Sequence, residues 1–218
     1  MINCFGSSEK AQDTTSEIIA AGGEEIAVEG DLTKAADAEN LVEEATKAFG
    51  ESIDILMNNA GGIVERKTLD EMDAEFFNYV LQLNITSTFL LTTAVAAKMG
   101  EGGSIVNIAS QAGRDGGGPG AAAYATSKGA VMTFTRAMAK ELGPKGIRVN
   151  ALCPGMINTT FHHAFTKDEA RTNVAIGRPL GREGAPNEVA TIISFLASSE
   201  SSFLSGVNLN ANGGLLFS

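Results

Sequence analysis

Residues 105–153 read IVNIASQAGRDGGGPGAAAYATSKGAVMTFTRAMAKELGPKGIRVNALC, and they contain two apolar runs on either side of one helical pattern. The runs at 105–109 and 147–153 are short and apolar, which is typical of parallel strands covered on both faces. The helical pattern at 124–142 ends at Gly143-Pro144, a helix stop signal. A strand, a crossover helix and a second strand in this order predict a parallel sheet.

The same alternation continues on both sides of this stretch. Further apolar runs lie at 1–5, 26–28, 53–57 and 207–209, and further helical patterns lie at 8–21, 35–49, 70–99 (in two pieces) and 186–198. We therefore expect an α/β fold: a doubly wound parallel sheet of the Rossmann type, in a single domain that spans residues 1–218. The segment 155–185 is too long for a simple connection, and we expect a substrate lid there.

The composition is that of a globular protein, with 218 residues, 44% hydrophobic and 19% charged. The formal net charge of -10 argues against a nucleic-acid or anionic-membrane surface, because both need Lys/Arg patches. No apolar run approaches the roughly 18 residues of a membrane span, and residues 1–5 lack the features of a signal peptide. Cys4 and Cys153 have no metal-ligand spacing, so we expect no metal site and a reducing, cytoplasmic location.

The helical pattern at 124–142 begins with Tyr124-Ala125-Thr126-Ser127-Lys128. Tyr124 and Lys128 are four residues apart and lie on one face of a helix. An ammonium beside a phenol favours the phenolate, so we expect the pKa of Tyr124 to fall below its free value of about 10. Ser110 lies 14 residues upstream, and a hydroxyl near the phenol can bond a substrate oxygen. These residue types suit the interconversion of a carbonyl and an alcohol.

Taken alone, this evidence is weak. Tyr-x-x-x-Lys occurs by chance on many helices, and Ser110 taken alone is a strand-end serine that caps backbone groups. The context is more specific: Asn58-Asn59-Ala60-Gly61 follows one apolar run, and Pro154-Gly155-Met156-Ile157-Asn158-Thr159 follows another. This ordered set resembles the short-chain dehydrogenase/reductase family, and the resemblance extends through essentially the whole chain.

The resemblance implies an NAD(P)(H)-dependent oxidoreductase whose catalytic residues are Ser110, Tyr124, Lys128 and Asn84. Tyr124 is then the general acid in reduction and the base in oxidation, Lys128 also bonds the nicotinamide ribose, and Ser110 orients the carbonyl. Asn84 helps to hold a water that links the lysine to solvent, although a plain buried hydrogen bond explains it equally well. The resemblance also implies a small-molecule carbonyl or alcohol substrate.

The same resemblance implies a set of cofactor-binding residues. Asn58, Ala60 and Gly61 lie along the adenosine ribose, Asp31 and Leu32 contact adenine, and Pro154, Gly155 and Thr159 lie beside the carboxamide, with Tyr124 and Lys128 at the ribose. Each has a structural alternative: a small-residue turn that braces the sheet, a loop aspartate that caps the next helix, and a turn that ends a strand.

The choice of coenzyme depends on the end of the first apolar run. An acid there favours NAD, and here no acid occurs before Glu9. Ser7 and Ser8 can donate to a phosphate and Lys10 is near, so we expect NADP(H) more than NAD(H). The alternative for Ser7 or Ser8 is the N-cap of the following helix.

Dinucleotide folds of this kind bind pyrophosphate at their first strand-to-helix turn, through a glycine fingerprint that this sequence does not contain. Residues 1–5 look like the family's second strand. We therefore expect that the first strand, its glycine turn and its helix, on the order of 30 residues, are missing. The alternative hypothesis is a non-catalytic truncated relative that serves as a scaffold or subunit without binding cofactor.

Two further expectations concern the substrate and the assembly. Six cationic or imidazole side chains are candidates to bind a substrate carboxylate, or else form solvated salt bridges: Arg114, His162, His163, Lys167, Arg178 and Arg182. The sequence at 111–120 and 153–162 resembles that of reductases of unsaturated-uronate breakdown, which reduce 4-deoxy-L-erythro-5-hexoseulose uronate. We therefore expect the substrate to be a keto sugar acid or a similar small carbonyl. The family usually forms tetramers through its long helices and C-terminal segment, which implies a homotetramer.

Overall fold

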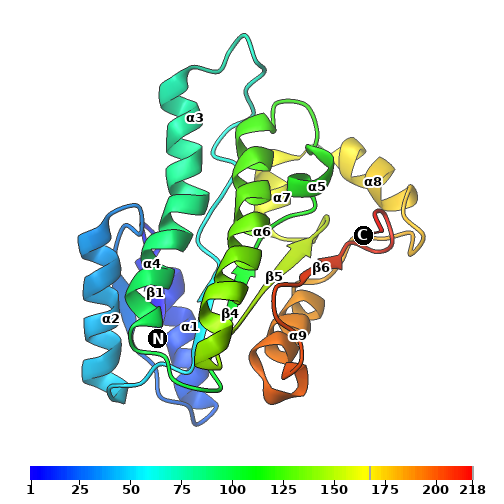
Figure 1. Ribbon diagram of the computed structural model, residues 1–218. Helices are drawn as coiled ribbons and strands as arrows, with labels where there is room; N and C mark the ends of the chain where they lie inside the picture. The colour runs from blue at the N-terminus through cyan, green and yellow to red at the C-terminus, as the bar shows by residue number, and fades with distance from the viewer. Residues whose placement is uncertain (167, 218) are drawn as a thin grey trace.

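The computed structural model describes residues 1–166 and 168–217 (Figure 1). Its strands are β1 (Ile2–Cys4), β2 (Ala27–Glu29), β3 (Ile55–Asn58), β4 (Ser104–Ile108), β5 (Arg148–Pro154) and β6 (Asn208–Ala211). Its α-helices are α1 (Ser8–Ala20), α2 (Ala35–Phe49), α3 (Ala74–Leu81), α4 (Ser87–Ala96), α5 (Ala112–Asp115), α6 (Ala122–Leu142), α7 (Thr160–Phe165), α8 (Asp168–Ile176) and α9 (Pro186–Ala197). A π-helical turn, η1 (Gln82–Thr86), joins α3 to α4, and short 3-10 turns lie at Gly143–Lys145 and Ser199–Ser201.

All strand pairs are parallel, as the alternation of strands and helices predicts. The ladders join β1 to β2 and, separately, β3 to β4, β5 and β6 in that order. Val106 of β4 lies between Met57 of β3 and Asn150 of β5 in register. The structure confirms a single α/β unit of the doubly wound type, with helices on both faces of the sheet (Figure 1).

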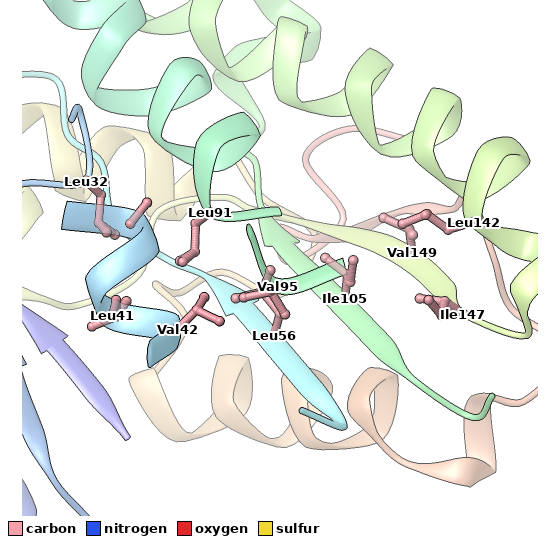
Figure 2. Packing of buried hydrophobic residues seen from close by; sticks show 11 residues of the cluster. Leu32, Leu41, Val42, Leu56, Leu91, Val95, Ile105, Leu142, Ile147 and Val149 are labelled. Carbon is pink, nitrogen blue, oxygen red and sulfur yellow. The ribbon is translucent and has the colours of Figure 1, made fainter. Parts of the chain in front are cut away.

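The larger core lies between the sheet and the helices α2, α4 and α6. Leu41 and Val42 of α2 and Leu91 and Val95 of α4 pack with apolar residues of the strands, and the labelled side chains of Figure 2 are Leu32, Leu41, Val42, Leu56, Leu91, Val95, Ile105, Leu142, Ile147 and Val149. A smaller core lies on the opposite face, where Leu196 of α9 packs on Val106 and Leu152. Each such side chain contributes roughly 1.5–3 kcal/mol when it is fully buried.

The strand β3 departs from the expectation of strands covered on both faces. Leu56 and Asn58 are buried, whereas Ile55 and Met57 on the other face are 54% and 40% exposed. The reason is that α9 packs over β4 and β5 on that face. The edge of β3 that faces away from β4 forms no ladder with β1 or any other strand among the described residues.

The continuous helical stretch Ala74–Ala96, made of α3, η1 and α4, is long and apolar enough to cross a membrane by length and composition. Polar residues interrupt every long apolar run in it, which is why the sequence pattern does not indicate a membrane span. In the fold, α4 packs against α2 and α3 packs against α6. The stretch is therefore part of the layer that covers the sheet.

Candidate active site

The first turns of α6 place Tyr124 and Lys128 beside the end of β4. The Lys128 side chain is buried (4% exposed), and its Nζ donates a 2.7 Å hydrogen bond to the Ile108 carbonyl. Nζ also lies 5.8 Å from the centre of the Tyr124 ring. Ser110 follows β4 by two residues, and its hydroxyl interacts with the Tyr124 phenol. The structure thus brings together the three residues that the sequence selects from two separate elements.

The electrostatics of the pair differ from the sequence expectation. Burial lowers the pKa of Lys128 to about 8, an effect that the Cys153 thiol partly opposes. Burial raises the pKa of Tyr124, and the Ser110 hydroxyl only partly offsets this. The expected lowering of the phenol pKa is therefore wrong for this structure, because desolvation of the phenolate outweighs the favourable interactions. A phenol with a raised pKa stays protonated at neutral pH and is a proton donor.

The Ser110 side chain also has the capping role that was its structural alternative. Its Oγ accepts a 3.1 Å hydrogen bond from the backbone N–H of Ala112. A hydroxyl has one O–H donor besides its acceptor lone pairs. The turn therefore fixes the position of the Ser110 Oγ and leaves its O–H free to donate.

The Asn84 side chain is fully buried in the π-helical turn η1, and its amide is bonded at both ends. Its Oδ1 accepts from the Gly62 N–H (3.0 Å), and its Nδ2 donates to the carbonyls of Gly62 and Val80 (2.9 Å each). Both amide hydrogens are used, so the plain hydrogen-bond interpretation describes this side chain. Its effect is to fix the loop after β3 against the helix, at a π-turn of the kind often found at functional sites.

Gly61 lies where this loop, Asn84 and Lys128 meet. Its φ is +151°, and a Cβ built on it would overlap Asn84 Oδ1 and lie 3.3 Å from Lys128 Nζ. Glycine is required here because any side chain would fill the space beside the ammonium. Ala60, its neighbour, is exposed.

Asn58 forms part of a buried polar ladder across the sheet. Its Nδ2 donates to Thr92 Oγ1 of α4 (3.0 Å) and to Asn107 Oδ1 of β4 (2.8 Å). Asn107 Nδ2 in turn donates to Thr135 Oγ1 of α6 (2.9 Å). The side chain of Asn58 thus braces the sheet against two helices, which matches its structural alternative.

The end of β5 forms the neighbouring wall of the site. The Gly155 N–H donates to the Ala211 carbonyl (2.9 Å), and a Cβ on Gly155 would come within 2.9 Å of Asn212. Pro154 is the last residue of β5, and Thr159 occupies the N-cap position of α7, where its Oγ1 donates to the Ile157 carbonyl (3.3 Å). These residues lie at the carboxyl ends of the strands, the edge at which open α/β sheets bind ligands.

The residues expected near the adenosine have mainly local roles. The Asp31 carboxylate accepts from the N–H (3.0 Å) and the hydroxyl (2.7 Å) of Thr33, and this hydrogen bond to the hydroxyl is the main cause of its lowered pKa. Leu32 belongs to the larger core. Ser7 and Ser8 are exposed just beyond β1, and Ser7 occupies the N-cap position of α1 without a side-chain capping bond.

The helix α7, within the expected lid, contributes residues that the sequence analysis missed. The Phe161 ring lies 5.9 Å from the Tyr124 ring, and the Phe165 ring lies 5.4 Å from that of Phe161. The only signal in the sequence is the spacing of four residues between the two phenylalanines. Burial lowers the pKa of the neighbouring His162, so this imidazole is neutral near pH 7.

The cations proposed for a substrate carboxylate bond other protein groups. Arg182 forms an ion pair with Glu188 (2.7 Å), Arg178 is buried and donates to the Met156 carbonyl (3.1 Å), and Arg114 donates to the Asn208 carbonyl. His163 shares a 2.9 Å hydrogen bond with Asn158, and Lys167 lies outside the described residues. The salt-bridge alternative therefore holds for Arg182.

The residues around Lys128 fit the nicotinamide half of a dinucleotide. The buried ammonium has two donor hydrogens beyond the one that bonds Ile108, and the absence of a side chain at Gly61 leaves space beside it. Ribose hydroxyls are suitable acceptors for such donors. Within residues 1–166 and 168–217, no group of three His, Cys, Asp or Glu side chains is placed to hold a metal ion.

Comparisons with known proteins identify relatives along almost the whole chain. A family model described as enoyl-(acyl carrier protein) reductase matches residues 3–216. An uncharacterized oxidoreductase of Methylorubrum extorquens is 36% identical over 217 residues, and a 3-oxoacyl-(acyl-carrier-protein) reductase of a Synechocystis species is 37% identical over 219 residues. Each alignment covers 99% of this chain and 86% of the relative.

Solved structures with the same fold are also similar in sequence. A short-chain dehydrogenase/reductase of Serratia marcescens has a TM-score of 0.91 at 30% identity, covering 98% of this chain and 85% of that one. A blue fluorescent protein from a metagenomic library, in complex with NADPH, has a TM-score of 0.90 at 29% identity (99% and 86% covered). An NADH-dependent reductase A1-R' responsible for alginate metabolism has a TM-score of 0.89 at 29% identity (100% and 86% covered).

Proposed function

This chain belongs to the short-chain dehydrogenase/reductase family and is a nicotinamide-dependent oxidoreductase, and we propose that it reduces a keto sugar acid or similar small carbonyl at Ser110, Tyr124 and Lys128. The observation that carries the proposal is the buried Lys128 ammonium, which lies 5.8 Å from the centre of the Tyr124 ring. The phenol of that tyrosine in turn interacts with the Ser110 hydroxyl.

The proposed chemistry assigns a separate task to each side chain. The Ser110 O–H and the Tyr124 O–H both donate hydrogen bonds to the carbonyl oxygen of the substrate, which polarises the carbonyl. The nicotinamide, when bound, supplies the hydride to the carbonyl carbon. The Tyr124 proton passes to the oxygen, so the products are an alcohol and a phenolate. The Lys128 ammonium stabilises that phenolate until a proton from solvent restores the phenol.

The substrate proposal is supported by sequence likeness and by one solved structure. The segments 111–120 and 153–162 resemble uronate reductases, and the similar structure from alginate metabolism is covered over 86% of its length. The second candidate is reduction of a 3-oxoacyl thioester, which the Synechocystis relative favours. Measuring NADPH oxidation with 4-deoxy-L-erythro-5-hexoseulose uronate and with acetoacetyl-coenzyme A distinguishes them. A kcat/KM higher for the thioester contradicts the first proposal.

We propose that the coenzyme is NADP(H) rather than NAD(H). The exposed hydroxyls of Ser7 and Ser8 lie just beyond β1, where they can donate to a 2′-phosphate. The ratio of kcat/KM for NADPH to that for NADH tests the proposal, and we expect a value above one. Replacing Ser8 with Asp should lower the ratio, since a carboxylate repels the phosphate; an unchanged ratio contradicts this assignment.

We further propose that a strand and a helix from outside residues 1–218 fit between β1 and β3. The support is that the ladders of β1–β2 and β3–β6 are separate, and that Ile55 and Met57 of β3 are exposed on one face. Such a unit would pair both edges and supply the helix N-terminus that holds a pyrophosphate. The intact mass of the protein from its source tests this. A value near 22.6 kDa, the mass of the 218 residues, contradicts it.

We propose a cytoplasmic homotetramer, with α3, α4 and α6 in one interface. Phe89 of α4 is 48% exposed, and its ring meets that of Phe134 of α6 edge to face at 6.3 Å. An aromatic pair with one exposed ring, on two helices, is a suitable anchor for another subunit. Sedimentation of the Phe89→Glu variant should show smaller species than the wild-type protein, whereas Leu69→Glu, at a loop residue, should not.

A further inference from the structure

Arg66, in the loop between β3 and α3, lies where three segments around Tyr124 meet. Its Nε donates to the carbonyl of Phe165 in α7 (2.8 Å), and its Nη1 donates to the carbonyl of Pro119 in the glycine-rich loop before α6 (3.0 Å). Phe165 packs on Phe161, and Phe161 lies against the Tyr124 ring. The Arg66 side chain therefore joins the loop after β3 to the helix that carries Phe161 and to the loop before α6.

The backbone around Arg66 holds it firmly in this position. The Lys67 N–H donates to the Gly120 carbonyl (3.1 Å), and a Cβ on Gly120 would lie 2.9 Å from the Arg66 Cβ. Val64 has a φ of 65°, and the Glu65 N–H donates across it to the Ile63 carbonyl (2.7 Å), which forms a tight γ-turn. Left-handed backbone at a β-branched residue is strained, and such strain is concentrated at ligand clamps and active sites.

Arg66 has no carboxylate partner in the part of the chain that the structure describes. The neighbouring Glu65 pairs with Lys67 (3.7 Å), and the lid's Glu183 pairs with Arg171 (2.7 Å). The two carbonyl bonds of Arg66 leave Nη2 and the second hydrogen of Nη1, which together form the end of the fork that binds a carboxylate. The guanidinium is exposed and thus open to a ligand from solvent.

We propose that Arg66 binds the carboxylate of the substrate, at the end of the molecule away from the carbonyl that Tyr124 protonates. This inference rests on the proposed function and defines its substrate class: a short oxo acid with the carbonyl and the carboxylate at opposite ends. The carbonyl end lies at Tyr124 and Ser110, while the carboxylate lies past Phe161 and Phe165. In 4-deoxy-L-erythro-5-hexoseulose uronate the group reduced is then the C1 aldehyde, because the C5 ketone adjoins the C6 carboxylate.

The test compares an acid with its neutral derivative in variants of one side chain. The substrates are 4-deoxy-L-erythro-5-hexoseulose uronate and its methyl ester, and the variants are Arg66→Gln and Arg66→Lys. Lys67→Gln is the matched control, since Lys67 is adjacent and already paired with Glu65. We expect Arg66→Gln to lower kcat/KM for the acid by about 10- to 100-fold, mainly through KM, with the ester changed less than threefold. Arg66→Lys should retain part of the preference.

A second readout does not depend on turnover. Binding of D-glucuronate and of D-glucose to the full-length protein is measured by calorimetry, and we expect Arg66→Gln to weaken only the glucuronate binding, by at least tenfold. If the wild type reduces neither uronate nor ester but this selective loss occurs, the inference stands and the proposed substrate fails. Equal losses for acid and ester would mean that Arg66 only fixes the lid through Phe165. That result, or unchanged glucuronate binding, overturns the inference.

Discussion

The side-chain amide of Asn84 and the backbone of Gly62 exchange two hydrogen bonds, of 3.0 Å and 2.9 Å, although the residues are 22 positions apart. The pairing joins the π-helical turn η1 to the loop that follows β3. It thereby fixes the position of Gly61 beside the Lys128 ammonium. The geometry of the proposed site therefore depends on a residue whose own side chain has no donor hydrogen left for a ligand.

Asn84→Ala removes these bonds and leaves the half-buried N–H and C=O of Gly62 without their side-chain partner. We expect the free energy of unfolding to fall by about 2–4 kcal/mol, because unpaired buried polar groups are costly. Urea denaturation followed by circular dichroism measures the change. The exposed Asn78, on α3 of the same helical stretch, supplies the control Asn78→Ala, for which we expect a change within about 0.5 kcal/mol. Similar losses of stability in both variants would contradict the proposed role of Asn84 in fixing the loop after β3.

Tyr124→Phe removes the proposed proton donor but keeps the ring that packs on Phe161. We expect kcat to fall by about 100-fold or more, while the affinity for NADPH, followed by its fluorescence, changes less than threefold. The other tyrosine of the chain, Tyr79, is exposed on α3, so Tyr79→Phe is a matched control. Activity of Tyr124→Phe within a few-fold of the wild type would refute the catalytic assignment.

The lowered pKa of Lys128 predicts that the free energy of unfolding depends on pH. Its folded pKa is about 8, below the value of 10.5 for an exposed lysine, so burial of the ammonium penalises the folded state wherever both states are protonated. Between about pH 8 and 10.5 the folded protein releases this proton while the unfolded chain keeps it. The free energy of unfolding therefore rises with pH in that window, by about 3 kcal/mol in all.

The Lys128→Met variant lacks this contribution and should also be inactive. We expect the stability of the wild type relative to the variant to increase from pH 7.5 to 10.5, and Lys140→Met, at an exposed position of α6, to show no such trend. Denaturation in guanidinium chloride at several pH values gives both curves. A constant difference between wild type and Lys128→Met would show that the ammonium is not penalised by burial.

In Gly61→Ala the new methyl group would overlap Asn84 Oδ1 and lie next to Lys128 Nζ. The alanine would also have to adopt the φ of +151° found at Gly61. We expect a loss of about 2 kcal/mol or more in stability, together with weaker NADPH binding, since the methyl group fills the space beside the ammonium. Gly100→Ala is the control, because a Cβ there meets no atom within 4 Å. Thermal unfolding and fluorescence titration measure the two effects, and equal behaviour of both variants would contradict the steric argument.

The sequence predicted the strands and helices well because their signals are local. The apolar runs at 105–109 and 147–153 became β4 and β5, and the stop at Gly143-Pro144 marks the end of α6. The sequence also selected Ser110, Tyr124 and Lys128, which lie together in the structure. The position of these residues along two adjacent elements is enough to predict that they lie close together, since parallel strands end at one edge of the sheet.

Other features depend on contacts between distant segments, and no local pattern predicts them. The raised pKa of Tyr124 follows from how deeply the fold buries the phenol, which the spacing to Lys128 does not reveal. The contact between Phe161 and Tyr124 depends on the path of the chain after β5, and the contacts of Arg66 join residues 99 and 53 positions apart. The sequence placed Asn58 in a turn after an apolar run, but its partners Thr92 and Asn107 come from other elements.

The separation of the β1–β2 ladder from β3–β6 has a consequence for how the molecule opens. The unit β1–α1–β2 contacts mainly itself, whereas β4 and β5 are paired on both sides and covered by helices. Local opening costs least where few tertiary contacts must be broken. In the 218-residue chain alone, the amide protons of Asn3 and Cys4 are therefore expected to exchange with deuterium long before those of Val106 and Leu152. Proteases should cut its amino-terminal unit while the part that carries Tyr124 and Lys128 is still folded.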